Sequence, residues 1–252
     1  MTGQSPPSPQ NHNNSNGGIG PGESFESFFE GWRTRQNQYL EQLVFVQENC
    51  GQIPDRDVQV LVSRVLSHYQ QYYSTKSIAA HENVHTLFAP PWFTPFERTF
   101  LWIAGFKPGL MFRIVNNSVS DMSQEQSRQL SRLRLEIRAV EKELSDEMAR
   151  VQEGVVGGQL VELASRTARL VDGEADELGE ALEALRAGME VLLENADFLR
   201  MTTARAVVEI LTPNQAVRVL AAAAELFRRI RAWGLQLDMA RRGGGRSPPL
   251  RP

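Results

Sequence analysis

The sequence predicts an all-α protein, a helical bundle, from three observations. Apolar residues recur at helical spacing through most of residues 25–240, and no segment shows the sustained two-residue alternation of a strand. Helix-start signals also stand where the periodic runs begin. Thr94-Pro95-Phe96-Glu97 and Thr212-Pro213-Asn214-Gln215 are alike: each has a capping Thr, a Pro at the first helical position and a residue able to close a capping box.

Composition places the chain among ordinary globular proteins. Of its 252 residues, 41% are hydrophobic and 23% are charged, enough to bury a substantial core. The single cysteine, Cys50, excludes an internal disulfide framework and fits a reducing compartment. We see no secretory signal and no apolar run of membrane-spanning length, so we expect the nucleus or the cytoplasm and no membrane association.

Low-complexity sequence marks both ends of the chain. Residues 1–22 are rich in Pro, Asn, Ser and Gly, and residues 243–252 contain three Gly and three Pro. Such segments lack the apolar surface that would offset the entropy of ordering them. We therefore expect one helical domain over residues 23–242 between two disordered tails.

Three helices and a short helical piece are predicted in the first half. A first helix ends at Gly51, and a second follows Pro54-Asp55. The aromatic block over residues 89–106 is expected to open a third helix that ends near Gly105, and a short piece follows at residues 110–115. The stripe of the first helix is Phe25, Phe28, Phe29, Trp32, Tyr39, Leu40, Leu43 and Val44.

From Ser123 onward the apolar spacing alternates between three and four, which is typical of a heptad seam. Glycines at 154, 157 and 158 separate two such runs, with a short amphipathic piece at residues 160–171 between them. We expect an antiparallel helical hairpin, followed by a last helix from Pro213. The apolar seam could be buried either in an intramolecular core or in a homodimer interface, and the intramolecular core is favoured.

His81-Glu82-Asn83-Val84-His85 matches the zinc-protease pattern HExxH. Two His four residues apart on a helix can share a metal, with Glu82 as base on a bound water. Phe88 and Pro91 stand where the metzincin pattern needs Gly and a third His, and the helix is about to end. We interpret the three residues as a decoy and expect no metal.

No other catalytic constellation is evident in the sequence. The glycines near residue 154 lack the Lys and the preceding strand of a phosphate-binding loop, and Cys50 has no evident His partner. A non-enzymatic protein is expected.

Positive charge gathers near the C-terminus. Residues 213–252 hold eight Arg against Glu225 and Asp238, a net +6 that leaves −9 for residues 1–212. In one interpretation these arginines contact phosphates or an acidic partner. The favoured interpretation is a solvated helix face whose arginines pair with acidic neighbours such as Glu141, Glu143 and Glu147. The candidate contacts are Arg228, Arg229, Arg231, Arg241 and Arg242.

These segments together resemble the delay-of-germination (DOG) domain of plants, which also forms the C-terminal regulatory half of the TGA-type bZIP transcription factors. The resemblance covers about residues 23–240. Its pieces include residues 25–32, 61–69, 91–98, 101–108, 123–126, 196–200 and 211–216. The signature positions are Trp92, Thr94, Pro95, Glu97, Arg98, Trp102, Gly105, Thr212 and Pro213.

The resemblance implies a non-enzymatic plant regulator. Because residues 1–22 contain no basic zipper, the chain is similar to the stand-alone members, which act in seed dormancy and abscisic acid signalling, in stress responses or in pollen aperture formation. The implied partners are clade A protein phosphatases 2C or bZIP transcription factors. Sequence-specific DNA binding is the alternative, directly or through a bZIP partner.

Two further implications concern particular residues. Dormancy members are associated with haem through a His pair in the last helix, but the matching positions here are Phe227 and Arg231, so no cofactor is expected. The phosphatase contact is expected on the first helix, where an aromatic-anchored helix suits recognition in a groove. Its candidate anchors, which a core role would also explain, are Phe25, Phe28, Phe29 and Trp32.

Overall fold

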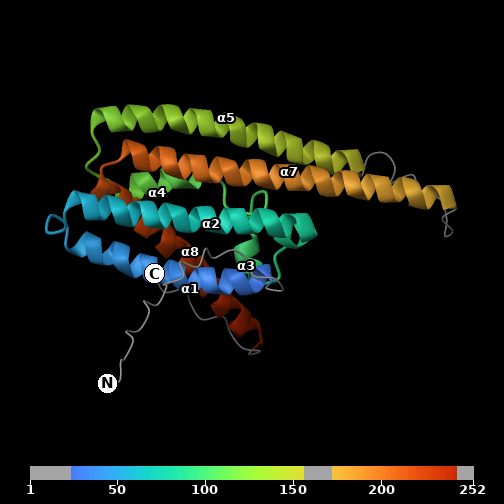
Figure 1. Ribbon diagram of the computed structural model, residues 1–252, viewed down its shortest axis with the longest axis horizontal. Coiled ribbons are helices and arrows are strands. Elements are labelled where there is room, and N and C mark those ends of the chain that lie inside the picture. The colour runs from blue at the N-terminus through green and yellow to red at the C-terminus, as the bar shows by residue number, and fades with distance from the viewer. Residues whose placement is uncertain (1–23, 156–171, 243–252) are drawn as a thin grey trace, which may run out of the picture.

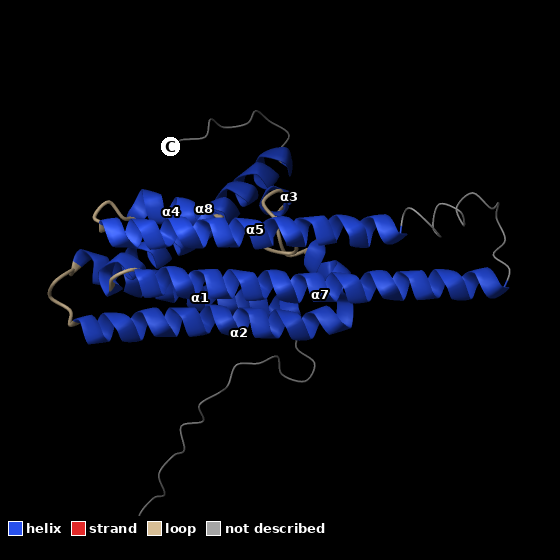
Figure 2. Cartoon of the chain, turned by 90° about the horizontal axis from the view of Figure 1, so that it is seen from above, coloured by secondary structure: helices blue, strands red, loops and turns tan. Residues whose placement is uncertain are grey.

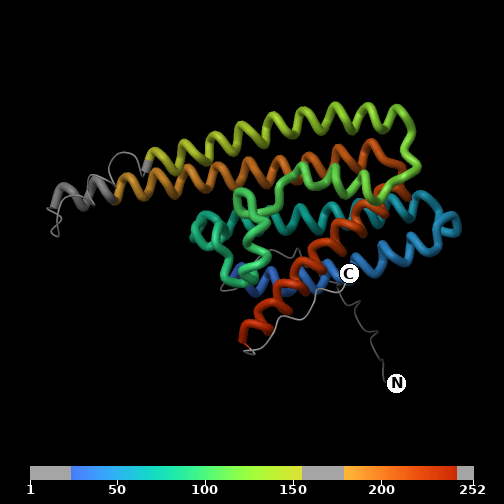
Figure 3. Tube along the Cα trace, turned by 180° about the vertical axis from the view of Figure 1, so that it is seen from behind, coloured from blue at the N-terminus to red at the C-terminus, as the bar shows by residue number. Residues whose placement is uncertain are grey.

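A computed structural model describes residues 24–155 and 172–242. Both tails and the predicted piece at residues 160–171 lie outside the described residues. Within them the chain is all-α, as predicted, and contains no strand. The long helices run side by side in the order α5, α7, α2, α1, and α8 crosses behind them (Figures 1 and 3).

Helix α1 (Phe25–Glu48) and helix α2 (Asp55–Phe88) form the first hairpin. Ser24 caps α1 by accepting from the Ser27 amide at 3.2 Å. Gly51 has φ +87, a left-handed conformation that glycine adopts without strain, and it follows α1 as predicted. Helix α2 is regular up to Asn83, whose φ of −159° and ψ of 89° interrupt the helix one turn before its end.

The predicted third helix is much shorter than expected. Helix α3 is one turn (Pro95–Arg98), and turns replace the helix up to Gly105. Trp102 and Gly105 instead pair through their backbones, with N–O distances of 2.6 and 3.2 Å. The carbonyls of this segment accept from buried side chains, as shown below, and this competes with helical bonding. Helix α4 (Leu110–Ser118) follows and packs on α8.

Helix α5 (Gln124–Val155) and helix α7 (Asp172–Ile210) form the predicted antiparallel hairpin (Figure 2). The seam is buried where the hairpin lies on the body: Leu192 and Ala196 are 1% and 0% exposed. Val140 and Leu182, which the heptad pattern also assigned to the seam, are exposed. The seam therefore serves as core over part of its length.

Helix α8 (Pro213–Arg242) begins with the predicted cap. The Thr212 amide donates to Gln215 Oε1 at 3.0 Å, and the Gln215 amide donates to Thr212 Oγ1 at 3.4 Å. The first half of α8 enters the main core beside α1, α2 and α4, and Val217, Val219 and Leu220 are at most 2% exposed. Its C-terminal end projects from the body (Figure 1). No helix in the described part of the chain is long and apolar enough to span a bilayer.

Candidate functional site

Three charged side chains are buried where α2, α7 and the segment after α3 meet. Lys76 on α2 is 1% exposed, and Asp197 and Arg200 on α7 are 5% and 7% exposed. Lys76 Nζ donates to Asp197 Oδ1 at 3.0 Å, and Arg200 Nη1 donates to the same oxygen. A buried cation needs such a partner, because its desolvation is otherwise uncompensated.

The same two cations hold the backbone of residues 102–106. Lys76 Nζ donates to the Ala104 carbonyl at 2.7 Å. Arg200 donates to the carbonyls of Phe106 at 2.7 Å, Ile103 at 2.9 Å and Trp102. We call Lys76, Asp197 and Arg200 the carbonyl clamp. Burial lowers the pKa of Lys76 to about 8, and Asp197 opposes part of that shift.

The clamped segment is a strained turn. Ile103 and Ala104 have φ of 44° and 54°, in the left-handed region that side chains with a Cβ rarely adopt, and Ile is β-branched. Such residues persist only where the surroundings hold them, and here the clamp does so. Gly105 is required for a different reason: a Cβ there would lie 2.7 Å from Arg200 Cζ.

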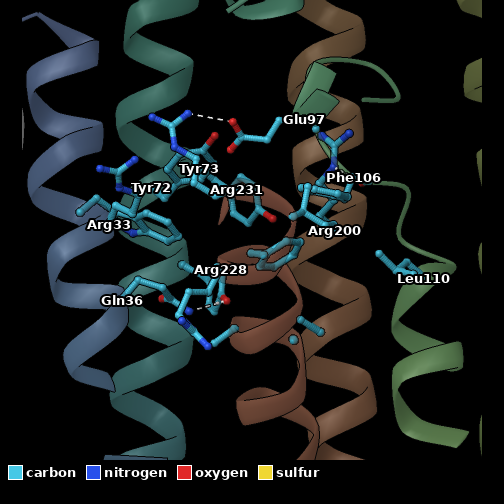
Figure 4. Close-up of a pocket in the computed structure, with 18 of the residues that line it drawn as sticks. Arg33, Gln36, Tyr72, Tyr73, Glu97, Phe106, Leu110, Arg200, Arg228 and Arg231 are labelled. Carbon is cyan, nitrogen blue, oxygen red and sulfur yellow. Dashed lines mark hydrogen bonds and ion pairs between the residues drawn. The ribbon is translucent and has the colours of Figure 1, made fainter. Parts of the chain in front are cut away.

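The strained turn forms one wall of a cavity of about 410 Å³. Helices α1, α2, α4, α7 and α8 supply most of the other walls, and Figure 4 shows side chains that line the cavity. This volume falls within the range of small-molecule sites, about 300–1,000 Å³. Aliphatic side chains form much of the lining, and the aromatic residues in it include Trp32, Tyr69, Tyr72, Tyr73, Phe106 and Phe227. Burial raises the pKa of Tyr72 and Tyr73, so both phenols stay neutral.

The cations around the cavity all have carboxylate partners. Arg231 Nη1 lies 2.8 Å from Glu97 Oε2, and Arg228 Nε lies 2.7 Å from Glu225 Oε2. Arg33 pairs with Glu30 at 3.2 Å, and Lys107 lies 3.9 Å from Glu141. With the clamp, every Lys or Arg that lines the cavity has a carboxylate partner. Lys76 and Arg200 share the single carboxylate of Asp197, so the buried clamp holds one cation more than it holds carboxylates.

The candidate arginines of α8 separate into three groups. Arg228 and Arg229 both pair with Glu225, not with the acidic residues of α5 that we named as neighbours. This double pairing lowers the pKa of Glu225 to about 2, and the bond to Arg228 is the main cause. Arg231 turns inward, where it donates to the Trp92 carbonyl at 2.7 Å. Arg241 and Arg242 are exposed in the last turn.

The aromatic residues proposed as anchors on α1 lie in the core. Phe25, Phe28, Phe29 and Trp32 are between 4% and 8% exposed. Trp32 stacks on His68 of α2 with ring centres 4.6 Å apart, and its indole donates to the His68 carbonyl at 3.0 Å. As placed, these four side chains offer almost no surface to a partner, which agrees with the core role that the sequence also allowed, and their role as partner anchors stays a prediction. The outward face of α1 presents Glu26 and Glu30 instead.

The HExxH residues lie on the last turns of α2. Asn83 departs from helical geometry between His81 and His85, so the two imidazoles do not share a regular helix face. His81 Nδ1 instead lies 3.0 Å from Glu190 Oε2 of α7. No cluster of metal-ligating residues occurs within residues 24–155 and 172–242.

Of the signature residues, Thr94 and Glu97 form the joint between α3 and α8. Thr94 Oγ1 accepts from the Glu97 amide at 3.2 Å, and Glu97 Oε2 accepts from the Thr94 amide at 2.7 Å. Arg98 donates to the Phe93 carbonyl, and the Trp102 indole donates to Ser145 Oγ at 3.0 Å. Of the haem-associated positions, Phe227 packs on Phe106 with ring centres 4.6 Å apart. Arg231, the other position, is the partner of Glu97.

Comparison with known proteins identifies the family. The DOG1 family, described as seed dormancy control, matches residues 38–117. Protein ZW2 of Arabidopsis thaliana is 38% identical over 84% of this chain and 97% of its own length. The chain belongs to the DOG1 family. Protein RESPONSE TO ABA AND SALT 1 of the same plant is 39% identical over 83% of this chain and 94% of its own length.

More distant relatives of this DOG1-family chain include transcription factors. Transcription factor TGA3 of Arabidopsis thaliana is 30% identical over 87% of this chain, but the match covers 55% of the length of that factor. These relatives support a regulatory role for the chain. The match covers about half of the length of these factors, so the functions of the complete factors are not assigned to this chain.

Sequence reasoning missed most of the cavity. Lys76 and Gln36 were not singled out, because each stands inside an otherwise apolar helical stripe. Asp197 and Arg200 appeared only within a family motif. Their spacing of three residues on the buried side of α7 was the available signal, since charged residues on a buried face need partners.

Proposed function

We propose that this DOG1-family chain is a non-enzymatic regulator that binds other regulatory proteins in seed dormancy and abscisic acid signalling. The near full-length match to a protein named for its response to abscisic acid and salt carries the proposal. The family description, seed dormancy control, supports it. The carbonyl clamp is also consistent with a non-enzymatic role, because its buried charged groups hold the backbone carbonyls of residues 102–106.

The proposed partner is a clade A protein phosphatase 2C, and the proposed contact is the outer face of α1. Glu26 and Glu30 are exposed there, and Arg33 is paired with Glu30. Because the aromatic side of α1 is committed to the core, recognition would use this polar side. Charge complementarity on such a surface contributes mainly to specificity and to the association rate.

Affinity purification from seed and anther tissue tests this proposal. The intact chain is compared with a variant carrying Glu26→Arg and Glu30→Arg, which changes the charge of the face and leaves the core untouched. We expect the intact chain to retain a clade A phosphatase from seed and the variant to lose it. Recovery of a different partner class from anther alone would favour a role in pollen.

Similarity to the TGA factors favours a second function, association with DNA directly or through a bZIP partner. The exposed Arg241 and Arg242 would contact phosphates. A salt titration of binding to promoter DNA tests this. Sequence preference retained at physiological salt would support the DNA function, and steep salt dependence without sequence preference would leave only nonspecific attraction.

A further inference from the structure

Arginines without an ionic partner gather on the face that α4 forms with the first half of α5. Arg113 on α4 and Arg138 on α5 are exposed, and Arg134 on α5 is partly buried. Within residues 24–155 and 172–242, the side chains of these three residues form neither an ion pair nor a hydrogen bond. We call Arg113, Arg134 and Arg138 the arginine patch.

The two α5 arginines lie on the side of that helix that is turned towards α4. Arg134, Arg138 and Glu141 stand four and three residues apart, so they share one side of α5. Glu141 identifies that side, because its Oε1 accepts from the Gly109 amide at the start of α4 at 2.5 Å. The side chains of both arginines therefore emerge beside α4, which lies alongside α5 in Figure 3.

The contact between Gly109 and Glu141 also brings Arg113 level with the α5 arginines. Arg113 follows Gly109 by four residues, and Arg138 precedes Glu141 by three. Because α4 and α5 run antiparallel (Figure 3), both arginines are displaced in the same direction from this contact, each by about one helical turn. Long side chains from two helices can therefore reach one ligand.

Nearby carboxylates do not neutralise the arginine patch. Glu136 stands two residues from each of the α5 arginines, so it lies on a different side of the helix. Glu141 is engaged by the Gly109 amide and lies 3.9 Å from Lys107. Three arginines thus remain without an ionic partner at the surface of a chain whose formal net charge is −3.

The chemistry of the patch favours a phosphate monoester over a carboxylate. Arginine presents a planar fork of N–H donors that bonds phosphate oxygens in pairs. A phosphorylated side chain carries about −1.5 to −2 charges at neutral pH and three acceptor oxygens, whereas a carboxylate carries one charge and two oxygens. Three arginines from two directions match the phosphate group better.

The limited extent of the patch favours a single phosphate over a nucleic acid. A nucleic-acid backbone needs positive charge along a track, because its phosphates repeat at short intervals. Beyond Arg138, α5 instead carries Glu143, Asp146 and Glu147 within two turns. These carboxylates would repel the next phosphates of a backbone, and they would not meet an isolated phosphate held between α4 and α5.

We propose that the arginine patch binds a phosphorylated segment of a partner protein, with one phosphate monoester held between α4 and α5. Clusters of arginine are a recurrent means of recognising phosphorylated motifs. The site uses neither α1 nor the α8 arginines, so it is separate from the contacts proposed above. Association through this face would depend on the phosphorylation of the partner.

Fluorescence anisotropy with three matched peptides tests the proposal on the intact chain at physiological salt. The probe is a short fluorescein-labelled peptide of glycine and alanine with one central phosphoserine. The matched peptides carry glutamate or serine at that position. We expect the phosphoserine peptide to bind about 10-fold more tightly than the glutamate peptide, because it gains charge-assisted hydrogen bonds. The serine peptide should show no saturable binding.

Single substitutions assign the binding to the patch. Arg113→Gln, Arg134→Gln and Arg138→Gln should each weaken phosphoserine binding about 3–10-fold, since each removes one donor group. Arg132→Gln is the matched control, because Arg132 is exposed and lacks an ion pair within the described residues but lies two residues from Arg134, on another side of α5. It should change the affinity by less than about twofold, since exposed charges are screened by salt.

Four results would overturn the proposal. These are equal binding of the phosphoserine and glutamate peptides, no saturable binding of the phosphoserine peptide, or an equal loss with Arg132→Gln. The fourth is tighter binding of a labelled DNA duplex that the three patch substitutions weaken, which would assign the patch to nucleic acid. The variant with Glu26→Arg and Glu30→Arg should keep phosphoserine binding, so failure of the proposed phosphatase contact is distinguishable from failure of this site.

Discussion

The side chain of Thr94, which caps α3, lies directly against the backbone of Gly234 in α8. A Cβ placed on Gly234 would overlap Thr94 Oγ1 and lie 2.9 Å from Thr94 Cβ. Glu97 of the same capping box reaches Arg231, one turn earlier on α8, at 2.8 Å. One helix start therefore fixes how the aromatic segment meets the last helix.

Gly234→Ala is expected to destabilise the protein despite the higher helix propensity of Ala. The methyl group would displace Thr94, so an overpacking cost of about 1–3 kcal/mol adds to partial loss of the cap, about 1 kcal/mol. Denaturant unfolding measures the change. Gly179→Ala on α7, where a Cβ would meet nothing within 4 Å, is the control and should be neutral or stabilising.

Arg200→Ala should cost more than most single substitutions in this chain. It removes one of the two cations that share Asp197 and releases three carbonyls, and breaking a buried pair typically costs about 3–5 kcal/mol. The free energy of unfolding checks this, with Arg205→Ala as the exposed control on the same helix. Losses of equal size at both positions would contradict a structural role for the clamp.

Stability should fall in mild acid because of His68. Burial lowers the pKa of His68 to about 4, and the positive charge of Arg35 adds to the shift. The unfolded chain, with a pKa near 6.5, binds a proton that the folded chain rejects between these values. The corresponding stability, up to about 3 kcal/mol, is present above pH 6.5 and is lost as the pH falls towards 4. Unfolding measured from pH 7 to pH 4 should show this slope, and His68→Phe should remove most of it.

The two sides of α1 should respond differently to substitution. Phe29→Ala removes a buried ring that packs on Trp32 and Phe93, so it should cost about 3–5 kcal/mol of stability. Glu30→Arg lies on the exposed side and should change stability by less than about 0.5 kcal/mol while weakening phosphatase binding. Thermal unfolding and a binding titration separate the two effects. A stable Phe29→Ala variant that loses the phosphatase would restore that ring as a partner anchor.

Local signals made the fold predictable, and long-range pairing limited the prediction of the site. The caps at Thr94 and Thr212, the stop at Gly51 and the heptad spacing of α5 and α7 are encoded within a few residues, and each occurs where expected. The one-turn length of α3 depends on Lys76 and Arg200, which come from other helices. The sequence of residues 95–105 itself carries no signal for the contacts that Lys76 and Arg200 make with this segment.

The cavity could not be predicted from the sequence for the same reason. Gln36 and Arg231 are far apart in the sequence, and each is an unremarkable polar residue within its own helix. Only packing of α1 against α8 puts both on the lining of one cavity. The α8 arginines illustrate the point further, since Arg231 turns inward to Glu97 while Arg229, two residues before it, pairs with Glu225 at the surface.

Titration of the purified chain with a purified clade A protein phosphatase 2C tests the central claim most directly. We predict saturable binding that the combined Glu26→Arg and Glu30→Arg substitutions abolish. Circular dichroism should show that the doubly substituted chain remains folded. Absence of binding to the phosphatase, together with sequence-selective binding to promoter DNA at physiological salt, would contradict the account.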